Sequence, residues 1–171
     1  SDIKEKKVSI ILSTYNEELA IEKTINEIQK HIKNVEIIVV DDNSSDKTFE
    51  ILSKYQSDRL KIFSRKKTKG LASAFLLGLI NSNGDVIGWV DSNMSSVVRL
   101  FPEMINNLEN NDVVLLSRFV DGGNDERNKV RKFSSYLLNK ITKFVLRSKV
   151  NDLSSGLFVM KKEVLLDTLP I

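Results

Sequence analysis

An oxygen-rich triplet follows an apolar run near the middle of the chain: Asp91, Ser92 and Asn93 come directly after residues 86–90. An open α/β sheet binds its ligand at the carboxyl ends of its strands, and hard oxygen atoms there suit Mg²⁺ or Mn²⁺ carrying a phosphate. On an extended segment, Asp91 and Asn93 point to the same side and can share an ion. The triplet therefore predicts a metal and phosphate site with one charged ligand.

A second acidic group, Asp41 and Asp42, ends the apolar run at residues 35–40. Carboxylates at a strand end can accept hydrogen bonds from the N–H of a base or from ribose hydroxyls. The first apolar run of the chain ends in residues 13–17, which offer the ring of Tyr15 and several hydrogen-bonding groups. Two acidic strand ends in one sheet predict a nucleotide site.

Two common phosphate-binding motifs are absent from the sequence. It contains no GxxxxGK loop, and no GxGxxG follows the first apolar run. A kinase-like or dinucleotide-binding function therefore loses its main support.

Apolar runs alternate with helical patterns along the chain. Strands are predicted at 8–12, 35–40, 60–63, 86–90 and 112–117, and helices at 21–32, 46–55, 70–80, 102–108 and 128–149. Strands separated by helices need crossover connections, so the predicted fold class is α/β, with a doubly wound, mostly parallel sheet and helices on both faces, as in Rossmann-like proteins. Residues 1–171 are expected to form a single domain, with a loop at 121–125.

Two of these helices carry more detailed predictions. Ser45 or Asp46 is placed to cap the helix at 46–55. The buried stripe of the helix at 70–80 is predicted to be Leu71, Ala74, Phe75 and Leu79.

The composition is that of a soluble globular protein, with 171 residues, 41% apolar, 29% charged and no cysteine. Without cysteine, neither a disulfide nor a thiolate zinc site can form, which fits a cytosolic setting. No apolar stretch approaches the roughly 18 to 20 residues that cross a bilayer. Because the chain begins with Ser1 and ends without a polar tail, we expect it to be a fragment truncated at its carboxyl end.

The net charge is only +3, but residues 126–149 carry eight basic side chains against the single acid Glu126. Such a segment can meet phosphate, an anionic membrane surface or nucleic acid, or it can be a solvated helix face. We expect peripheral contact with a membrane and no nucleic-acid partner.

Six motifs occur in the order and spacing of a known catalytic domain. They are residues 8–17, 39–48, 69–72, 91–93, 117–123 and 152–157. Together they resemble the family-2 inverting glycosyltransferases with the A-type fold (GT-A), and most closely the dolichyl-phosphate mannosyltransferase and polyprenyl-phosphate glycosyltransferase branch. The resemblance covers nearly the whole chain and implies the same doubly wound fold.

The resemblance also implies roles for individual residues. In the donor site it assigns Thr14, Tyr15, Glu17, Asp41 or Asp42, Lys69 and Gly70 to the nucleotide, and Asp91 and Asn93 to the metal and diphosphate. It matches Arg118, Arg131 and Ser135 to positions that bind phosphate groups, with Ser135 counted among the nucleotide-binding residues. It names Asp91, Arg118, Arg131 and Asp152 as the catalytic residues, and Asp152 would organise the acceptor site or its arginines rather than act as an obligatory base. Arginine suits this task because its planar fork binds phosphate oxygens bidentately.

The implied reaction is the inverting transfer of a hexose from GDP-mannose or UDP-glucose to a dolichyl or polyprenyl phosphate, assisted by Mg²⁺ or Mn²⁺, at the cytoplasmic face of a membrane. The sequence does not choose between the donors or between the metals. A phosphate monoester is already largely ionised at neutral pH, its second pKa being about 6, so this reaction needs no strong general base.

The chain departs from the family pattern at several positions. Asn93 stands where a second acid is usual, Ser13 where proline is usual, and residues 96–98 where a His-Pro-Pro region is usual. The chain also ends where relatives continue into membrane-associated helices. Loss of one negative charge at position 93 should weaken metal binding.

Three other functions compete with this one. A transferase of the same fold could act on a sugar hydroxyl, in which case a carboxylate must remove a proton. A catalytically weak, nucleotide-sugar-binding regulatory domain would fit Asn93. A phosphate-accepting receiver domain ranks last, because its acidic pair follows the first strand, whereas Asp41 and Asp42 follow the second.

Overall fold

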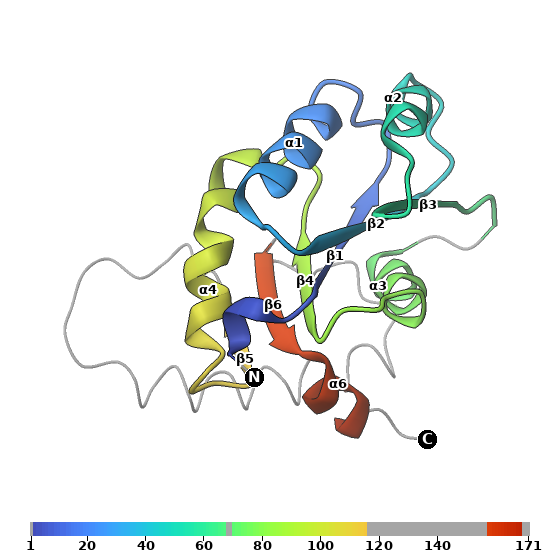
Figure 1. Cartoon of the computed structure of the whole chain (residues 1–171). Helices are drawn as coiled ribbons and strands as arrows, with labels where there is room; N and C mark the ends of the chain where they lie inside the picture. Colours follow the sequence, from blue (N-terminus) through green and yellow to red (C-terminus); the bar gives the residue numbers. More distant parts are fainter. Residues whose placement is uncertain (1, 68–69, 116–156, 169–171) are drawn as a thin grey trace.

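The strands form one six-stranded sheet, with helices covering both of its faces (Figure 1). The computed structural model describes residues 2–67, 70–115 and 157–168. The strands are β1 (Val8–Thr14), β2 (Val35–Asp41), β3 (Leu60–Ser64), β4 (Val86–Val90), β5 (Val113–Leu115) and β6 (Leu157–Lys161). The helices are α1 (Ile21–His31), α2 (Thr48–Tyr55), α3 (Leu71–Ile80), α4 (Phe101–Asn107) and α6 (Lys162–Thr168), with short 3-10 helices η1 (Ile3–Glu5) and η2 (Ser95–Leu100).

The predicted α/β fold class is confirmed. The order of the strands is β3-β2-β1-β4-β6-β5, and β3, β2, β1 and β4 run parallel to one another. The predicted loop at 121–125 and basic helix at 128–149 lie outside the described residues. None of the helices that the structure describes is long and apolar enough to cross a bilayer.

Strand β6 was not predicted, and it is antiparallel to both β4 and β5. Leu157 pairs with Val90 at the carboxyl end of β4, and Phe158 pairs with Leu115 at the end of β5. The last described residue of β5 and the first of β6 therefore lie at the same edge of the sheet as the carboxyl ends of the parallel strands. We call this the carboxyl edge.

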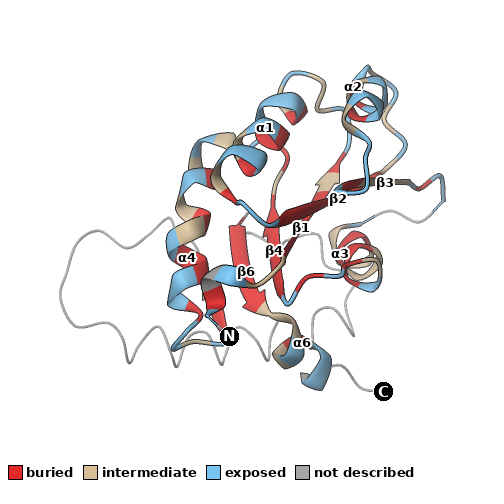
Figure 2. Ribbon diagram, viewed as in Figure 1, coloured by how far each residue is buried: buried red, intermediate tan, exposed pale blue. Residues whose placement is uncertain are grey.

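The core consists of two layers, one on each face of the sheet. Successive residues of β1 point to opposite faces: Ile10 and Leu12 join the cluster covered by α1, α2 and α4, and Ile11 joins the cluster covered by α3 and α6. Figure 2 shows the central strands buried along their length, while the helices are buried only where they face the sheet. Burial on both faces explains why these strands are continuous apolar runs.

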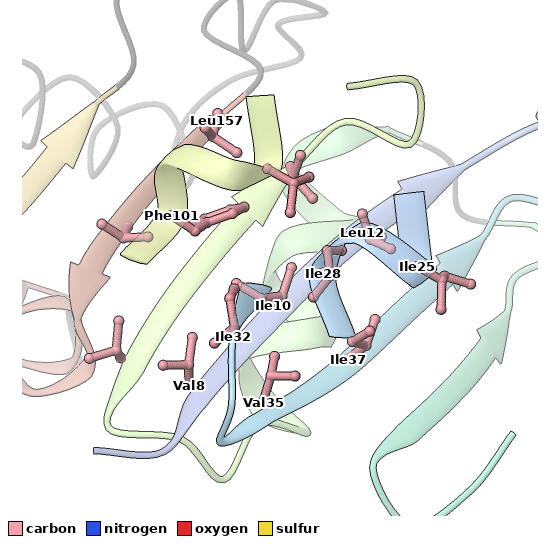
Figure 3. Close-up of a cluster of buried hydrophobic side chains, with 14 of the residues drawn as sticks. Val8, Ile10, Leu12, Ile25, Ile28, Ile32, Val35, Ile37, Phe101 and Leu157 are labelled. Carbon is pink, nitrogen blue, oxygen red and sulfur yellow. The ribbon is translucent and has the colours of Figure 1, made fainter. Parts of the chain in front are cut away.

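The predicted isoleucine stripe holds α1 to the sheet. Ile21, Ile25 and Ile28 are fully buried, and Ile32, at the carboxyl cap of the helix, is almost so. Figure 3 shows Ile28 and Ile32 close to Ile10 of β1, and Ile25 belongs to the same core cluster. Each such side chain contributes about 1.5–3 kcal/mol when it leaves water, which makes this stripe the main attachment of the helix.

The start of α2 differs from the prediction. The helix begins at Thr48 rather than at Asp46, because the Asp46 carboxylate accepts hydrogen bonds from the backbone N–H groups of Thr48 (2.9 Å) and Glu18 (3.2 Å). Asp46 therefore joins α2 to the loop after β1. Partial desolvation would raise the pKa of the Asp46 carboxyl, but its hydrogen bonds lower it below the ordinary value. The helix predicted at 102–108 begins one residue earlier, at Phe101.

Helix α3 approaches β1 closely at Gly78. Of its predicted stripe, Ala74, Phe75 and Leu79 are buried, whereas Leu71 is only partly buried. Gly78 is the buried position that the prediction missed. A methyl group there would lie 2.4 Å from Cγ2 of Ile11, so only glycine allows this approach.

Replacing Gly78 with alanine should lower the free energy of unfolding. Overpacking against the buried Ile11 costs about 1–3 kcal/mol, while the better helix propensity of alanine returns at most about 1 kcal/mol. Urea unfolding would measure the net loss. Ser53→Ala, at an exposed position of α2, is the matched control that gains propensity without a clash. A Gly78→Ala protein as stable as the wild type would contradict the close approach.

A buried carboxylate ties the opposite edge of the sheet together. Glu36 of β2 is 2% exposed and accepts hydrogen bonds from the Ser9 hydroxyl (2.5 Å) and the backbone N–H of Asn83. Lys7 lies 3.3 Å from the other oxygen, and the N–H of Gly84 donates to the Ser9 hydroxyl at 2.7 Å. Burial alone would raise the pKa of Glu36, but these hydrogen bonds and the charge of Lys7 lower it below its ordinary 4.5.

Candidate functional site

The carboxyl edge carries the polar ends of three neighbouring strands. Pairing between β1 and β2 continues to Thr14 opposite Asp41, whereas pairing between β1 and β4 ends at Ile11 opposite Trp89. The strand order reverses between β1 and β4, because β2 and β3 lie on one side of β1 and β4 lies on the other. Doubly wound sheets bind their ligands at such a switch point. The next residue after β4 is Asp91.

Two loops at this edge are fastened to each other through Asn16. Its backbone N–H donates to the Ser44 hydroxyl at 2.9 Å, and its side-chain oxygen accepts from the N–H of Ser45 at 2.8 Å. Asn16 and Asn43 have positive φ angles of 52° and 60°, a conformation that asparagine tolerates better than most residues. The loops after β1 and β2 therefore form one connected rim.

A second set of bonds continues this rim to the start of α2. The N–H of Glu17 donates to the Thr48 hydroxyl at 2.8 Å, and the N–H of Lys47 donates to the Glu18 carboxylate at 2.9 Å. These bonds fix the backbone beside Tyr15, whose side chain is 54% exposed. The rim thus presents the Tyr15 ring at the surface of the carboxyl edge.

Thr14 and Asp41 lie side by side at the ends of β1 and β2. Asp41 is almost fully buried, and both of its oxygens accept hydrogen bonds from Ser44: one from the backbone N–H at 3.0 Å and one from the hydroxyl. Thr14 is also buried, and its hydroxyl has no hydrogen-bond partner among the residues that the structure describes. Asp41 shapes the turn, whereas the Thr14 hydroxyl is available for a further bond.

The carboxylate of Asp42 forms an ion pair with Arg65, a residue that was not among the predicted site residues. Nε of Arg65 donates to Oδ1 of Asp42 at 2.7 Å, and the side chains are only 8% and 13% exposed. Arg65 also donates to the Ser73 hydroxyl at 2.7 Å and to the carbonyl oxygen of Gly70 at 3.1 Å. The two partners of this ion pair are 23 residues apart in the chain, and no local pattern indicates the contact.

Gly70 is the residue before the first turn of α3, and its φ of 119° is one that side chains rarely adopt. Of the predicted nucleotide residues Lys69 and Gly70, only Gly70 is described. Arg65 donates one hydrogen bond to the carbonyl oxygen of Gly70 and another to Asp42, and so connects the two residues. The predicted nucleotide residues of the second strand and of the loop before α3 are thus brought together.

The triplet after β4 is a turn and not an extended segment, which corrects the prediction. The N–H of Met94 donates to the carbonyl oxygen of Asp91 at 3.0 Å. Because a turn rotates successive side chains, the argument from strand alternation does not hold for Asp91 and Asn93. Ser92 between them is buried, and its carbonyl oxygen accepts from the Thr24 hydroxyl of α1 at 2.5 Å.

The residues of this turn fit a Mg²⁺ or Mn²⁺ ion. Asp91 is half-buried and Asn93 is exposed, and together they supply a carboxylate group and an amide group at the carboxyl edge. Among the described residues there is no cluster of three or more histidine or acidic side chains able to hold a metal. A Mg²⁺ site that leans on one or two protein oxygens is completed by water and substrate phosphates, which matches this donor set.

Four of the predicted site residues lie outside the described part of the chain. They are Arg118, Arg131, Ser135 and Asp152. Their roles therefore stay predictions.

The sequence matches one protein family over most of its length. The profile described as "Glycosyl transferase family 2" matches residues 9–169. The dolichol-phosphate mannosyltransferase of Pyrococcus furiosus is 34% identical over 92% of this chain and 47% of its own length. The undecaprenyl-phosphate 4-deoxy-4-formamido-L-arabinose transferase of Photorhabdus laumondii is 32% identical over 84% of this chain and 46% of its own. The chain thus spans about half the length of these curated relatives.

Solved structures share the fold. The mannosyltransferase PcManGT from Pyrobaculum calidifontis, in complex with GDP-Man and Mn²⁺, has a TM-score of 0.60 at 17% identity, covering 95% of this chain and 46% of that one. Glucosyl-3-phosphoglycerate synthase from Mycobacterium tuberculosis, in complex with Mn²⁺, UDP-glucose and phosphoglyceric acid, has a TM-score of 0.61 at 22% identity, covering 94% and 58%. At these identities the likeness establishes the architecture alone.

Proposed function

The chain belongs to glycosyl transferase family 2, and from that premise we propose that it transfers a hexose from a nucleotide sugar to a dolichyl or polyprenyl phosphate, inverting the anomeric carbon. The names of the two curated relatives, a dolichol-phosphate mannosyltransferase and an undecaprenyl-phosphate transferase, support a lipid-phosphate acceptor. The donor sugar and base are left open between GDP-mannose and UDP-glucose.

One structural observation carries the donor half of this proposal. The ends of β1 and β2 and the turn after β4 all lie at the carboxyl edge, beside the switch point of the sheet. The exposed ring of Tyr15 offers a surface on which a base can stack, while the Thr14 hydroxyl and the Asp42 carboxylate offer hydrogen bonds to the nucleoside.

Asp91 and Asn93 are the residues proposed to hold the metal and the diphosphate. A bound Mg²⁺ or Mn²⁺ ion would supply positive charge that offsets the charge of the leaving diphosphate. The chain's own contribution is to fix the turn that carries these oxygens, through the hydrogen bond between Asp91 and Met94 and the bond from Thr24 to Ser92. A preorganised turn avoids the cost of ordering these ligands during reaction.

The acceptor half of the proposal concerns residues 116–156. Arg118, Arg131 and Ser135 would bind phosphate groups, and Asp152 would organise the acceptor site without removing a proton, because a phosphate monoester is already ionised. The described residues next to this segment, Leu115 and Leu157, both lie at the carboxyl edge, which supports a role beside the donor site. The basic stretch 126–149 would contact an anionic membrane at its cytoplasmic face.

A panel of donors and acceptors tests the proposal. The protein is incubated with GDP-mannose or UDP-glucose, Mn²⁺ or Mg²⁺, and a short polyprenyl phosphate, and products are identified by mass. The expected product is a polyprenyl phosphate carrying one hexose. Transfer only to a sugar hydroxyl would contradict the acceptor class, and nucleotide binding without any transfer would favour a regulatory domain.

Replacing Asn93 with aspartate should tighten Mn²⁺ binding about tenfold, because the affinity of oxygen sites rises with the charge of their ligands. Isothermal titration with Mn²⁺ in the presence of GDP or UDP measures the change without relying on turnover. Asn34→Asp adds the same charge at an exposed position beyond the opposite edge of the sheet and is the matched control. Equal Mn²⁺ affinities of the wild type and Asn93→Asp would remove Asn93 from the metal site.

A further inference from the structure

We propose that Arg65 is a positioning residue for the donor nucleoside: it holds the Asp42 carboxylate and the first turn of α3 together as one preformed unit. The inference rests on the proposed function, because it concerns how the donor site is built. Arg65 itself is assigned no contact with the substrate.

The backbone of Arg65 continues the ladder between β2 and β3. Its N–H donates to the carbonyl oxygen of Asp41 at 2.8 Å, one residue beyond the pairing of Asp41 with Ser64. This bond places Arg65 beside the end of β2. From there its side chain reaches Asp42, the residue that follows β2, so the ion pair is set by the register of the two strands.

The guanidinium group is nearly buried, and its surroundings compensate the charge. Nε and Nη2 both contact Oδ1 of Asp42, at 2.7 and 2.5 Å. A buried charge is costly unless it is paired and hydrogen-bonded, and here the pairing carboxylate is itself 13% exposed. Separating the two side chains would leave a nearly buried charge unpaired, which costs free energy. The ion pair therefore fixes the direction of the Asp42 carboxylate.

The same guanidinium group reaches the start of α3. Nη1 donates to the Ser73 hydroxyl at 2.7 Å, Nη2 donates to the Gly70 carbonyl at 3.1 Å, and the Ser73 hydroxyl itself donates to that carbonyl at 3.0 Å. Gly70 has a φ of 119°, and glycine can adopt many other backbone conformations, so the hydrogen bonds to its carbonyl oxygen help to hold it in this one. One planar group thus bridges the end of β2 and the first turn of α3.

The second carboxylate oxygen of Asp42, Oδ2, is the atom that we expect to bind the nucleoside. Oδ1 of Asp42 is taken by Arg65, and no residue in the described ranges donates to Oδ2. Asp42 therefore presents one oxygen, in a fixed orientation, to a single N–H or hydroxyl donor of a nucleoside. A group that is ordered before binding does not have to be ordered by the ligand, which improves affinity.

Arg65→Lys tests this directly, because lysine keeps the charge but cannot span Asp42, Ser73 and Gly70 with one planar fork. We expect the Kd for GDP or UDP and the KM for the donor to rise at least about tenfold, the change expected when a charge-assisted hydrogen bond is lost. The kcat should change by less than about twofold, since chemistry at Asp91 is untouched. Arg59→Lys, before the opposite end of β3, is the matched control and should change neither value.

A second variant separates positioning from folding. Ser73→Ala removes one of the three partners of Arg65 and should raise the nucleotide Kd by about threefold, with a thermal unfolding midpoint close to that of the wild type. In a double-mutant cycle, Arg65→Lys and Asp42→Asn should be strongly non-additive in nucleotide affinity, because each removes the same contact.

The possible outcomes are distinct. If the wild type binds GDP or UDP and Arg65→Lys binds it equally well, the role of Arg65 is overturned while the proposed function stands. A lower unfolding midpoint with unchanged nucleotide affinity would likewise reduce Arg65 to a structural residue. If the wild type binds neither nucleotide, the proposed function itself fails and the inference about Arg65 fails with it.

Discussion

Replacing Asp91 with asparagine should reduce hexose transfer by about a hundredfold or more, because the proposed metal site would lose its only charged ligand. Asp91 begins the turn after β4, and Asn93 carries no charge to take its place. Asparagine has nearly the same shape, so the hydrogen bond between the Asp91 carbonyl and Met94 is preserved. Transfer is measured at saturating donor with increasing Mn²⁺, and Mn²⁺ binding is measured separately by titration.

The control for this variant is Asp58→Asn, which removes a carboxylate from an exposed turn before β3, near the opposite edge. It should leave both transfer and Mn²⁺ binding unchanged. An Asp91→Asn protein that retains transfer within about threefold of the wild type would show that Asp91 does not support the leaving diphosphate, since loss of such a contact costs about a hundredfold or more.

Replacing Glu36 with glutamine should lower the free energy of unfolding by about 2–3 kcal/mol, the range expected when a buried, hydrogen-bonded charge loses its partners. The Ser9 hydroxyl and the Asn83 backbone N–H both donate to Oε1 of Glu36, and a glutamine oxygen can still accept these bonds. Its amide nitrogen, however, replaces the Oε2 atom that faces Lys7 and Lys61 and accepts from the side chain of Asn83, so the buried group loses its charge and its partners on that side. Thermal and urea unfolding measure the change. Glu50→Gln, on the exposed face of α2, should cost less than about 1 kcal/mol.

Glu36 also gives the protein a defined response to acid. Because the folded-state pKa of Glu36 lies below its ordinary 4.5, its contribution to stability is fully present above that value. As the pH falls, the unfolded chain binds the proton first, and the contribution is lost as the pH passes down through the folded-state pKa. From about pH 5 downward, wild-type stability should therefore fall more steeply than that of Glu36→Gln. Parallel curves for the two proteins would exclude this role of Glu36.

The parts of the fold that could be predicted are those set by local periodicity. The isoleucine stripe of α1 and the apolar runs of β1, β2 and β4 are each complete within a short stretch of sequence, and the structure confirms them. Strand β6 could not be placed in this way. Its run at residues 157–161 is as long as that of β4, but its position between β4 and β5 depends on antiparallel partners more than 40 residues earlier in the chain.

The candidate site was predictable in its composition but not in its contacts. Asp41, Asp42 and Asp91 were identified because each follows an apolar run, and the sheet brings their strands to one edge. Arg65 was missed because its partner Asp42 is fixed by the register of β2 and β3, which the sequence does not encode locally. The sequence predicts an extended segment at Asp91, because the hydrogen bond that fixes Ser92 in the turn comes from Thr24 of α1, far away in the chain.

The hydrogen-bonded neighbours β5 and β6 have an evolutionary consequence. Their ends at Leu115 and Leu157 are fixed next to each other by the ladder, whatever the intervening residues are, and the entropy of closing a loop rises only slowly with its length. Substitutions or insertions between these two ends therefore need not disturb the pairing of the sheet. If the proposed function holds, a change of acceptor could arise by variation between these ends while the strand ends at Thr14, Asp41 and Val90 keep their places in the sheet.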